Sequence, residues 1–439
     1  MHALSLLRSA LLGSLVLMLP LSTWAAETEA SRETSPEALP LKEISAMADV
    51  FERVKRAYVN PTDDKALLEG AMKGMVQQLD PHSSYLDPEA LRELREATEG
   101  EFGGVGLEVG LEKGRPTIIS PIDGTPAAQA GLKPHDVLLN VNGRSLEGLP
   151  LESIVTMMRG SIGSSVTLTV QGAENGETRT VTMQRASIQT PSITAQLIGH
   201  IGYIRISQFQ VRTGQELRQA ISRLQQQGAL EGIVLDMRNN PGGVLQGAVD
   251  VSSAFVNDGL VVYTQGRLKE SNMRYSTAHD AVLPTTPLVV LINDGTASAA
   301  EIVAGALQDH HRAVIMGTTS FGKGSVQSVL PLENGGGLKL TTALYYTPSG
   351  RSIQAEGIQP DITVAPANVQ PLATKAPVRK EADLKGHFAN TQQSTTATVS
   401  DHSSLAGALA HDYQVQEALQ LLKGMTVFNS LPAPSSHSK

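Results

Sequence analysis

The chain has 439 residues, of which 41% are hydrophobic and 18% charged, a composition typical of a globular protein of about two to four domains. Its formal net charge is −8, and an acidic body argues against nucleic acid as a partner. The sequence contains no cysteine, which excludes a thiol nucleophile, a cysteine-ligated metal, disulfides and the lipobox of a lipid-anchored leader.

Residues 1–25 predict a signal peptide. A weakly basic start that includes Arg8 is followed by an apolar run, Ala10–Leu21, and by a small-x-small cleavage site that ends at Ala25. The run is shorter than the roughly 20 residues that a membrane-spanning helix needs, so we expect cleavage and export rather than an uncleaved anchor. Residues 26–40 are polar and contain prolines, which predicts a flexible tether.

Residues 41–98 predict a small helical unit. Apolar side chains between Ile44 and Tyr58 recur at helical spacing, and a second helix is expected over Ala66–Leu79. A third helix is expected from about Pro88 to Thr98, with Asp87 as its N-cap. Their apolar faces have little of their own chain to cover them, so we expect a homo-oligomer formed through this unit, the C-terminal helix, or both.

Residues 99–187 are typical of a compact domain of short strands. A glycine cluster, GEFGGVGLEVG, opens the domain, and turn residues separate the runs that follow. The predicted strands are Gly106–Leu111, Thr117–Ile122, Asp136–Val141, Ser165–Gln171 and Thr178–Gln184.

Residues 188–365 alternate strands with helices, a pattern that indicates an α/β layer architecture. The predicted elements are strand Ile201–Phe209, helix Gln215–Gln227, strand Gly232–Met237, a helix from Val244, strand Leu288–Ile292 and a helix from Ser298.

The end of the chain divides into a linker and a helical segment. Residues 366–400 are rich in proline, alanine, threonine, serine and glutamine, which is typical of a linker. In the segment 401–439 we expect an amphipathic helix over Ser404–Leu422, which would pack on the body or on another subunit.

A serine at the start of a helix is the first candidate catalytic residue. Ser298 follows a buried strand and a polar turn, where backbone N–H groups and the positive end of the helix can stabilise an oxyanion. Serine at this place is most often only a cap, so the rest of the site must decide.

A lysine between two glycines is the second candidate. A lysine is usually a solvated surface charge, but a desolvated lysine such as Lys323 can lose its charge and accept the proton of a serine. Gln327 follows four positions later in SFGKGSVQ, and in a strand the two side chains share a face. Gln327 would then hold the amine without adding charge.

A strand that ends in Pro241-Gly242-Gly243 supplies a place where backbone can approach a substrate closely. An oxyanion hole needs two donors, for which the N–H of Ala299 and that of either Gly242 or Gly243 are the candidates. The sequence leaves the choice between the two glycines open, and a mere turn is the alternative interpretation.

The segments DMRNNPGG, NDGTASAAEI and FGKGSVQ, in this order and spacing, resemble the carboxyl-terminal processing (tail-specific) protease family. The resemblance runs from about Ile44 to Val364 and includes LDPHSSYL and GRSIQAEGIQPDITV. It implies that Ser298 is the nucleophile, Lys323 the general base and Gln327 the residue that orients the base. It also implies a crotonase-like α/β core with an inserted PDZ domain, acting as a serine endopeptidase.

The same resemblance suggests location and partners. Members of this family are found in the bacterial periplasm, where they trim envelope proteins by their C-termini, some with a helical-repeat lipoprotein adaptor. We expect no cofactor.

The segment SPIDGTPAAQAGLKPHDVLLNVNG resembles PDZ domains, which bind a chain end as an added strand and hold its carboxylate on a glycine loop. A helix over Leu149–Met158 would close the groove, and Arg159 after it is either a surface charge or a regulatory partner of a carboxylate near the active site. The candidate peptide-binding residues are Gly104, Val105, Gly106 and Leu107 in the loop and Leu151, Ile154, Val155 and Met158 on the helix.

A Ser-His-Asp hydrolase is the nearest enzymatic alternative, because Asp309, His310 and His311 follow on the helix of Ser298. At 1.5 Å per residue, Ser298 and His310 are roughly 18 Å apart, beyond hydrogen-bond reach. This alternative needs a distant histidine such as His279.

Two further alternatives are a metal site and a scaffold. The sequence has no HExxH-like spacing, so we expect no metal. A non-catalytic PDZ scaffold with a peptidase-like core is the alternative from another class, and the intact set of Ser298, Lys323 and Gln327 argues against it.

Overall fold

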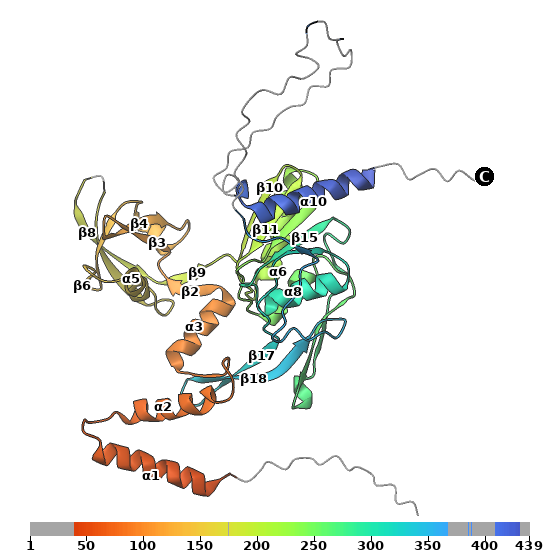
Figure 1. Cartoon of the computed structure of the whole chain (residues 1–439). Helices are drawn as coiled ribbons and strands as arrows, with labels where there is room; N and C mark the ends of the chain where they lie inside the picture. Colours follow the sequence, from red (N-terminus) through yellow and green to blue (C-terminus); the bar gives the residue numbers. More distant parts are fainter. Residues whose placement is uncertain (1–38, 174, 368–384, 386–387, 389–408, 431–439) are drawn as a thin grey trace, which may run out of the picture. The chain divides into compact units, whose positions relative to one another are not determined.

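A computed structural model describes residues 39–173, 175–367, 385, 388 and 409–430 (Figure 1). The predicted signal peptide over residues 1–25 lies outside the described residues, as do nearly all of the tether and most of the linker. The chain divides into two compact units, Met1–Leu68 and Glu69–Lys439. No helix of the described ranges has the length and apolar character needed to cross a membrane.

Three helices fall within the predicted helical unit: α1 (Leu41–Ala57), α2 (Asp64–Gln77) and α3 (Pro88–Glu99). No residue of α1 is buried, although the helix is amphipathic. The N-cap prediction for α3 is confirmed, because the side chain of Asp87 accepts a hydrogen bond from the N–H of Ala90 at 2.9 Å.

The glycine cluster leads through a two-stranded ribbon into a small β domain. The ribbon pairs β2 (Glu101–Gly104) with β9 (Ala186–Gln189). The domain's sheet has the order β3-β4-β5-β7-β8, with β6 paired to β5, so β3 lies at an edge. Its elements are β3 (Leu107–Glu112), β4 (Arg115–Pro121), α4 (Pro126–Gln129), β5 (Val137–Val141), β6 (Arg144–Ser145), α5 (Leu151–Met158), β7 (Ser165–Gln171) and β8 (Thr178–Gln184).

A six-stranded sheet organises the α/β region, in the order β10-β11-β12-β15-β16-β19. All its neighbouring strands are parallel except β10 and β11. The central strands β12 and β15 are buried along their whole length, as expected for a parallel sheet covered on both faces. The strands are β10 (Ile193–Ile198), β11 (Ile201–Ile206), β12 (Gly232–Asp236), β15 (Leu288–Ile292), β16 (Val314–Gly317) and β19 (Ile362–Thr363).

Helices cover the two faces of this sheet. Helices α6 (Thr213–Gln227), α7 (Leu245–Ser252) and α8 (Ala299–Asp309) contribute to the main hydrophobic core on one face. A second core on the other face joins the sheet to α10 (Tyr413–Ser430), which Figure 1 shows in blue across the strands. The predicted α/β class is confirmed by this arrangement.

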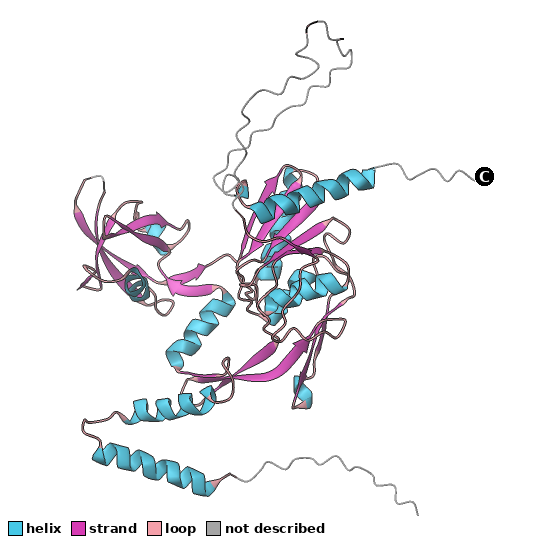
Figure 2. Cartoon of the chain, viewed as in Figure 1, coloured by secondary structure: helices cyan, strands magenta, loops and turns pink. Residues whose placement is uncertain are grey.

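A second, smaller sheet brings distant segments together, and Figure 2 shows its long strands in magenta. Its order is β1-β18-β13-β14, and β17 also pairs with β18. Strand β1 therefore joins the segment between α2 and α3 to the sheet that carries the Lys323 segment. The strands are β1 (Ser84–Leu86), β13 (Leu260–Gly266), β14 (Arg274–Ser276), β17 (Ser325–Pro331) and β18 (Gly337–Tyr346), and the 3-10 helix η1 (Lys269–Ser271) precedes β14.

The predicted C-terminal helix over Ser404–Leu422 is wrong in its bounds. A turn precedes Asp412, whose carboxylate accepts a hydrogen bond from the N–H of Val415 at 3.1 Å and so caps the new helix. Helix α10 then continues to Ser430. Residues 401–408 lie outside the described part of the chain.

Candidate functional site

Ser298 stands on a strained turn between β15 and α8, with φ 55° and ψ −117°. Two hydrogen bonds from this turn to the loop after β12 hold it: Thr296 Oγ1 donates to the carbonyl of Met237 at 2.9 Å, and Ala297 N–H donates to that of Asn240 at 2.9 Å. A non-glycine residue with positive φ persists only where its surroundings fix it, and such residues cluster at functional sites. The backbone angles of Ser298 are thus unlike the extended ones of an ordinary cap, although Ser298 and Glu301 form the reciprocal contacts of a capping box.

The Gly-Gly turn lies against this serine. Gly242 has φ +95°, and a Cβ atom added to it would lie 2.7 Å from the Cβ of Ser298. The N–H of Gly242 already donates to Oδ1 of Asn240 at 2.9 Å. The N–H groups of Gly243 and Ala299 bind no acceptor within the described ranges. These two donors are therefore the ones available to an oxyanion.

A buried carboxylate, which is not among the predicted site residues, joins the serine to the lysine loop. One oxygen of Glu301 accepts hydrogen bonds from the N–H groups of Ser298 and Lys323, both at 2.8 Å. The other oxygen accepts from Gly322 N–H at 2.7 Å and from Ser320 Oγ at 2.6 Å. Glu301 is 0% exposed, and this burial raises its pKa in spite of the four hydrogen bonds.

Lys323 is half-buried beside this carboxylate. Burial lowers the pKa of its amine, and the positive charge of Lys339 lowers it further, against the opposing charges of Glu301 and Asp80. The phenol of Tyr345 donates a hydrogen bond to the carbonyl of Lys323 and also interacts with the Ser298 side chain. In the described part of the chain, no hydrogen bond joins Ser298 Oγ to Lys323 Nζ directly.

The expectation that Lys323 and Gln327 share one strand face is not met. Strand β17 begins only at Ser325, and its register against β18 shifts between Val326 and Gln327. The amide of Gln327 donates instead to Ser325 Oγ at 3.0 Å and to Thr341 Oγ1 at 3.3 Å.

The histidines of the Ser-His-Asp alternative lie in other contacts. His310 Nε2 contacts the carbonyl oxygen of Leu260 at 2.7 Å, and His279 Nδ1 lies 2.5 Å from Oδ2 of Asp258. A different histidine, His82, interacts electrostatically with the site: burial lowers its pKa, and the charge of Lys323 lowers it further. No local sequence signal marks His82, because only the fold brings it near the lysine.

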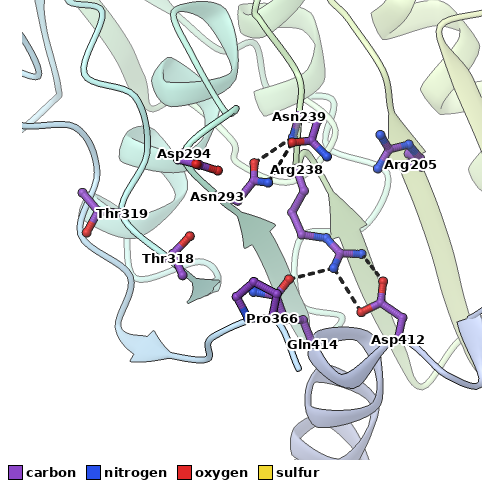
Figure 3. Close-up of a pocket in the computed structure, with 10 residues that line it drawn as sticks. All are labelled: Arg205, Arg238, Asn239, Asn293, Asp294, Thr318, Thr319, Pro366, Asp412 and Gln414. Atoms are coloured by element: carbon purple, nitrogen blue, oxygen red, sulfur yellow. Dashed lines mark hydrogen bonds and ion pairs between the residues drawn. The ribbon is translucent and has the colours of Figure 1, made fainter. Parts of the chain in front are cut away.

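A cavity of about 740 Å³, lined mostly by polar residues, opens at the carboxyl ends of β11, β12, β15 and β16, where α/β sheets commonly bind ligands (Figure 3). Neither Ser298 nor Lys323 lines it. Arg238 crosses the cavity to Asp412, 2.7 Å away, just before α10. No cluster of three or more His, Asp or Glu side chains suited to a metal occurs among the described residues.

The residues predicted to bind peptide lie in the glycine loop and on helix α5. The N–H groups of Val105 and Gly106 have no acceptor in the described ranges, while their carbonyls accept from Ala127 and Ile122, both at 2.9 Å. Gly104 ends β2 and Leu107 begins β3.

The helix α5 packs against the edge strand β3, as a peptide groove requires. Ile154 and Met158 face the domain's core, because residues four apart share a helix face, whereas Leu151 and Val155 are half-exposed. Of the four helix residues predicted to bind peptide, Leu151 and Val155 are thus the two whose side chains are partly exposed. The guanidinium of Arg159 stacks 4.3 Å from the ring centroid of Phe102, and it makes no ion pair in the described part of the chain.

Three parts of the chain match known protein families. Residues 200–364 match Peptidase family S41, residues 93–171 match the PDZ domain, and residues 19–90 match the activating protease CtpB N-terminal domain. Among solved structures, the photosystem II D1 C-terminal processing protease is 31% identical, with 74% of this chain and 93% of that chain covered and a TM-score of 0.44.

Two curated relatives carry the same kind of name. The carboxy-terminal processing protease CtpA of Bacillus subtilis is 38% identical over 314 residues, which cover 71% of this chain and 67% of that protein. The carboxy-terminal-processing protease of Bartonella bacilliformis is 42% identical over 411 residues, which cover 91% of this chain and 92% of that protein. With its S41 peptidase core and PDZ domain, the chain belongs to the carboxy-terminal-processing family of serine proteases.

Proposed function

We propose that this protein is an endopeptidase in which Ser298 is the nucleophile, Lys323 its general base and Gln327 a residue that orients the base. The observation that carries the proposal is the strained Ser298 turn, which Glu301 joins to the Lys323 loop through two backbone N–H groups. A lysine with a lowered pKa can act as a base near neutral pH.

The chemistry follows from these groups. The neutral amine of Lys323 takes the proton of Ser298 Oγ while that oxygen forms a bond to the scissile carbonyl carbon. The carbonyl oxygen becomes an oxyanion, which the free N–H groups of Ala299 and Gly243 would hold. The ammonium then returns the proton to the leaving nitrogen as the C–N bond breaks. Water repeats the sequence to release the acyl group.

The Ser298 and Lys323 side chains do not yet form a hydrogen bond, so substrate binding must bring them together. Catalytic hydrogen bonds are often long or absent without substrate and tighten in the complex. In this proposal the PDZ domain recruits the C-terminal tail of a substrate by adding it to the edge of β3, with its carboxylate on the free N–H groups of Val105 and Gly106.

A serine-reactive fluorophosphonate probe tests the proposal. We expect wild type and the Lys423→Ala control, which removes an exposed lysine on α10, to be labelled at Ser298 and to cleave a dye-quenched casein. Ser298→Ala and Lys323→Ala should lose cleavage while keeping the thermal unfolding midpoint and the affinity for a PDZ peptide. A folded protein that is never labelled would support a non-catalytic PDZ scaffold, and full activity in Lys323→Ala would refute the Ser-Lys mechanism.

We infer further that copies of the chain associate through α1. Four large apolar side chains of this helix are exposed, whereas α10 already uses its buried face on its own sheet. They are Leu41, Ile44, Met47 and Val50. Light scattering should give a mass above that of one chain, and a strict monomer at micromolar concentration would contradict this.

Export to a bacterial periplasm and the processing of envelope proteins, with or without a helical-repeat lipoprotein adaptor, complete the proposal. The support is the leader-like sequence of residues 1–25 and the family to which the chain belongs. Substrates trapped on Ser298→Ala in cells, compared with those on a Ser298→Ala variant that lacks the PDZ domain, should be envelope proteins with intact C-termini.

A further inference from the structure

The turn that precedes β1 is built around one carboxylate. Asp80 Oδ1 accepts hydrogen bonds from the N–H groups of His82 at 2.8 Å and of Ser83 at 2.9 Å, and Oδ2 accepts from Ser83 Oγ at 2.6 Å. Aspartate often holds such turns in this way. The geometry fixes where the carboxylate of Asp80 points.

This turn lies on the sheet that carries the proposed catalytic strand. Strand β1 pairs with β18, with Ser84 opposite Lys339. Two hydrogen bonds from Thr341 extend the contact: its N–H donates to Ser83 Oγ at 3.0 Å, and its hydroxyl donates to Asp80 Oδ1 at 3.1 Å. Residues 261 positions apart are thus in direct contact.

Thr341 also links this turn to Gln327, the glutamine of the proposed site. The amide of Gln327 on β17 donates to Thr341 Oγ1 at 3.3 Å, so the Thr341 hydroxyl accepts from Gln327 and donates to Asp80. A hydroxyl can do both at once, and each bond polarises the other. Asp80, Thr341 and Gln327 therefore form one hydrogen-bonded chain.

The same carboxylate acts on the lysine through its charge. The Lys323 amine experiences two anions, Asp80 and Glu301, and one cation, Lys339. His82 also faces it, and it interacts with Asp80 as well. Asp80 keeps a pKa below its usual value, first through the Ser83 hydroxyl, so it is charged at neutral pH.

We propose that Asp80 is a positioning residue of the peptidase site: through Thr341 it fixes the amide of Gln327, and it presents a negative charge to the Lys323 amine. This inference rests on the proposed function and adds a residue that comes from the N-terminal part of the chain. It follows that the N-terminal turn completes the site rather than only bracing it.

The two effects can be separated by substitution. Asp80→Asn keeps an oxygen that can accept from Thr341 but removes the charge, and asparagine also suits the turn. Without that anion the protonated form of Lys323 is less favoured, so the rise of activity with pH should move to lower pH. Thr341→Val removes the hydroxyl link but leaves the charge, and valine suits a strand.

The experiment measures kcat and KM for dye-quenched casein, and the rate of Ser298 labelling by the fluorophosphonate probe across pH, on the full chain. In Thr341→Val we expect about a tenfold fall in kcat, the size of one hydrogen bond, with KM and the pH of the rise unchanged. In Asp80→Asn we expect the rise to shift to lower pH, and Asp80→Ala should show both effects. Asp87→Asn, an acid-to-amide change at the α3 N-cap, is the matched control and should leave the rise in place.

Three outcomes would overturn the inference. They are an unshifted rise in folded Asp80→Asn, a wild-type kcat in Thr341→Val, or a shift of equal size in Asp87→Asn. If Asp80→Asn fails to fold, the kcat of Thr341→Val decides alone. Failure of the proposed function is distinguishable, because it would appear as activity in Lys323→Ala whatever the Asp80 variants do.

Discussion

The carboxylate of Glu301 accepts a hydrogen bond from the backbone N–H of Lys323 at 2.8 Å, although the two residues lie 22 positions apart. The same oxygen holds the N–H of Ser298. The loop that carries the proposed base and the turn that carries the proposed nucleophile are therefore fixed to one buried acid, which lies at the start of α8.

Glu301→Gln should damage both stability and catalysis. A glutamine amide offers one acceptor oxygen where the carboxylate offers two, so two of the four donors lose their partner and meet an NH2 group. At about 1–3 kcal/mol for each unpaired buried donor, the free energy of unfolding should fall by about 2–6 kcal/mol. Urea denaturation measures this loss.

The rate of fluorophosphonate labelling of Ser298 should fall by at least tenfold in the same variant, because the serine and the lysine loop are no longer held together. Glu231→Gln, at an exposed position, is the matched control and should match wild type in both measurements. Wild-type labelling in Glu301→Gln would show that the site does not depend on this acid.

The fold and the proposed catalytic residues were predictable from the sequence for local reasons. Buried strands such as β15 appear as continuous apolar runs, and Ser298 follows one at the start of an alanine-rich helix. The contacts of Glu301 and Asp80 were not predictable, because they join segments that are remote in the chain. The period-two alternation of a strand also gave the wrong face for Gln327, because residue types do not reveal a register shift such as the one before Gln327. The predicted bounds of the C-terminal helix were wrong because the cap at Asp412 was not recognised.

The alternative of a histidine base can be tested at His82. Among the described residues, His82 is the histidine whose charge interacts with that of Lys323, and its pKa is lowered, first by burial. If Lys323 is the base, the rise of kcat/KM with pH follows the lowered lysine pKa, below the ordinary value of 10.5, and His82→Gln keeps that rise. A histidine base would instead give a rise at or below pH 6.5, the ordinary value for histidine.

The measurement is kcat/KM against pH for wild type and for glutamine substitutions of His82, His279, His310 and His311. We expect all four folded variants to retain the rise. Its disappearance in any one of them would exclude the Ser-Lys assignment.

Gly242→Ala should abolish activity at a moderate cost in stability. The residue has φ +95°, which alanine adopts only under strain, and the new methyl carbon would lie 2.7 Å from the Cβ of Ser298. Either the serine or the Gly-Gly turn must move, so fluorophosphonate labelling should be lost. Gly424→Ala on α10 has no atom within 4 Å of the new carbon and should leave labelling intact, with stability equal or raised by up to about 1 kcal/mol. Labelling of Gly242→Ala at the wild-type rate would contradict the close approach of Gly242 to Ser298.

An ion pair between Arg238 and Asp412 joins the loop after β12 to the start of α10. Burial raises the pKa of Asp412, but the hydrogen bonds and charge of Arg238 outweigh this and leave that pKa below its usual value. Arg238 donates to the two carboxylate oxygens at 3.0 and 2.7 Å. A folded-state pKa below the unfolded value adds stability above the unfolded pKa of about 3.9, and this stability is lost as pH falls through the folded pKa.

Asp412→Asn should therefore be less stable than wild type at pH 7, and the difference should shrink as the pH is lowered below about 4. The loss at pH 7 includes the weaker compensation of the charge of Arg238, whose side chain is only 12% exposed and keeps Asp236 at 2.7 Å as a partner. Urea denaturation of both proteins between pH 3 and pH 7 measures the difference. Asp280→Asn removes an acid that also pairs with an arginine, Arg218, but is 55% exposed, and it should change stability by less than about 1 kcal/mol. A stability difference for Asp412→Asn that is independent of pH would mean that the loss comes from packing at the start of α10 and not from the charge of Asp412.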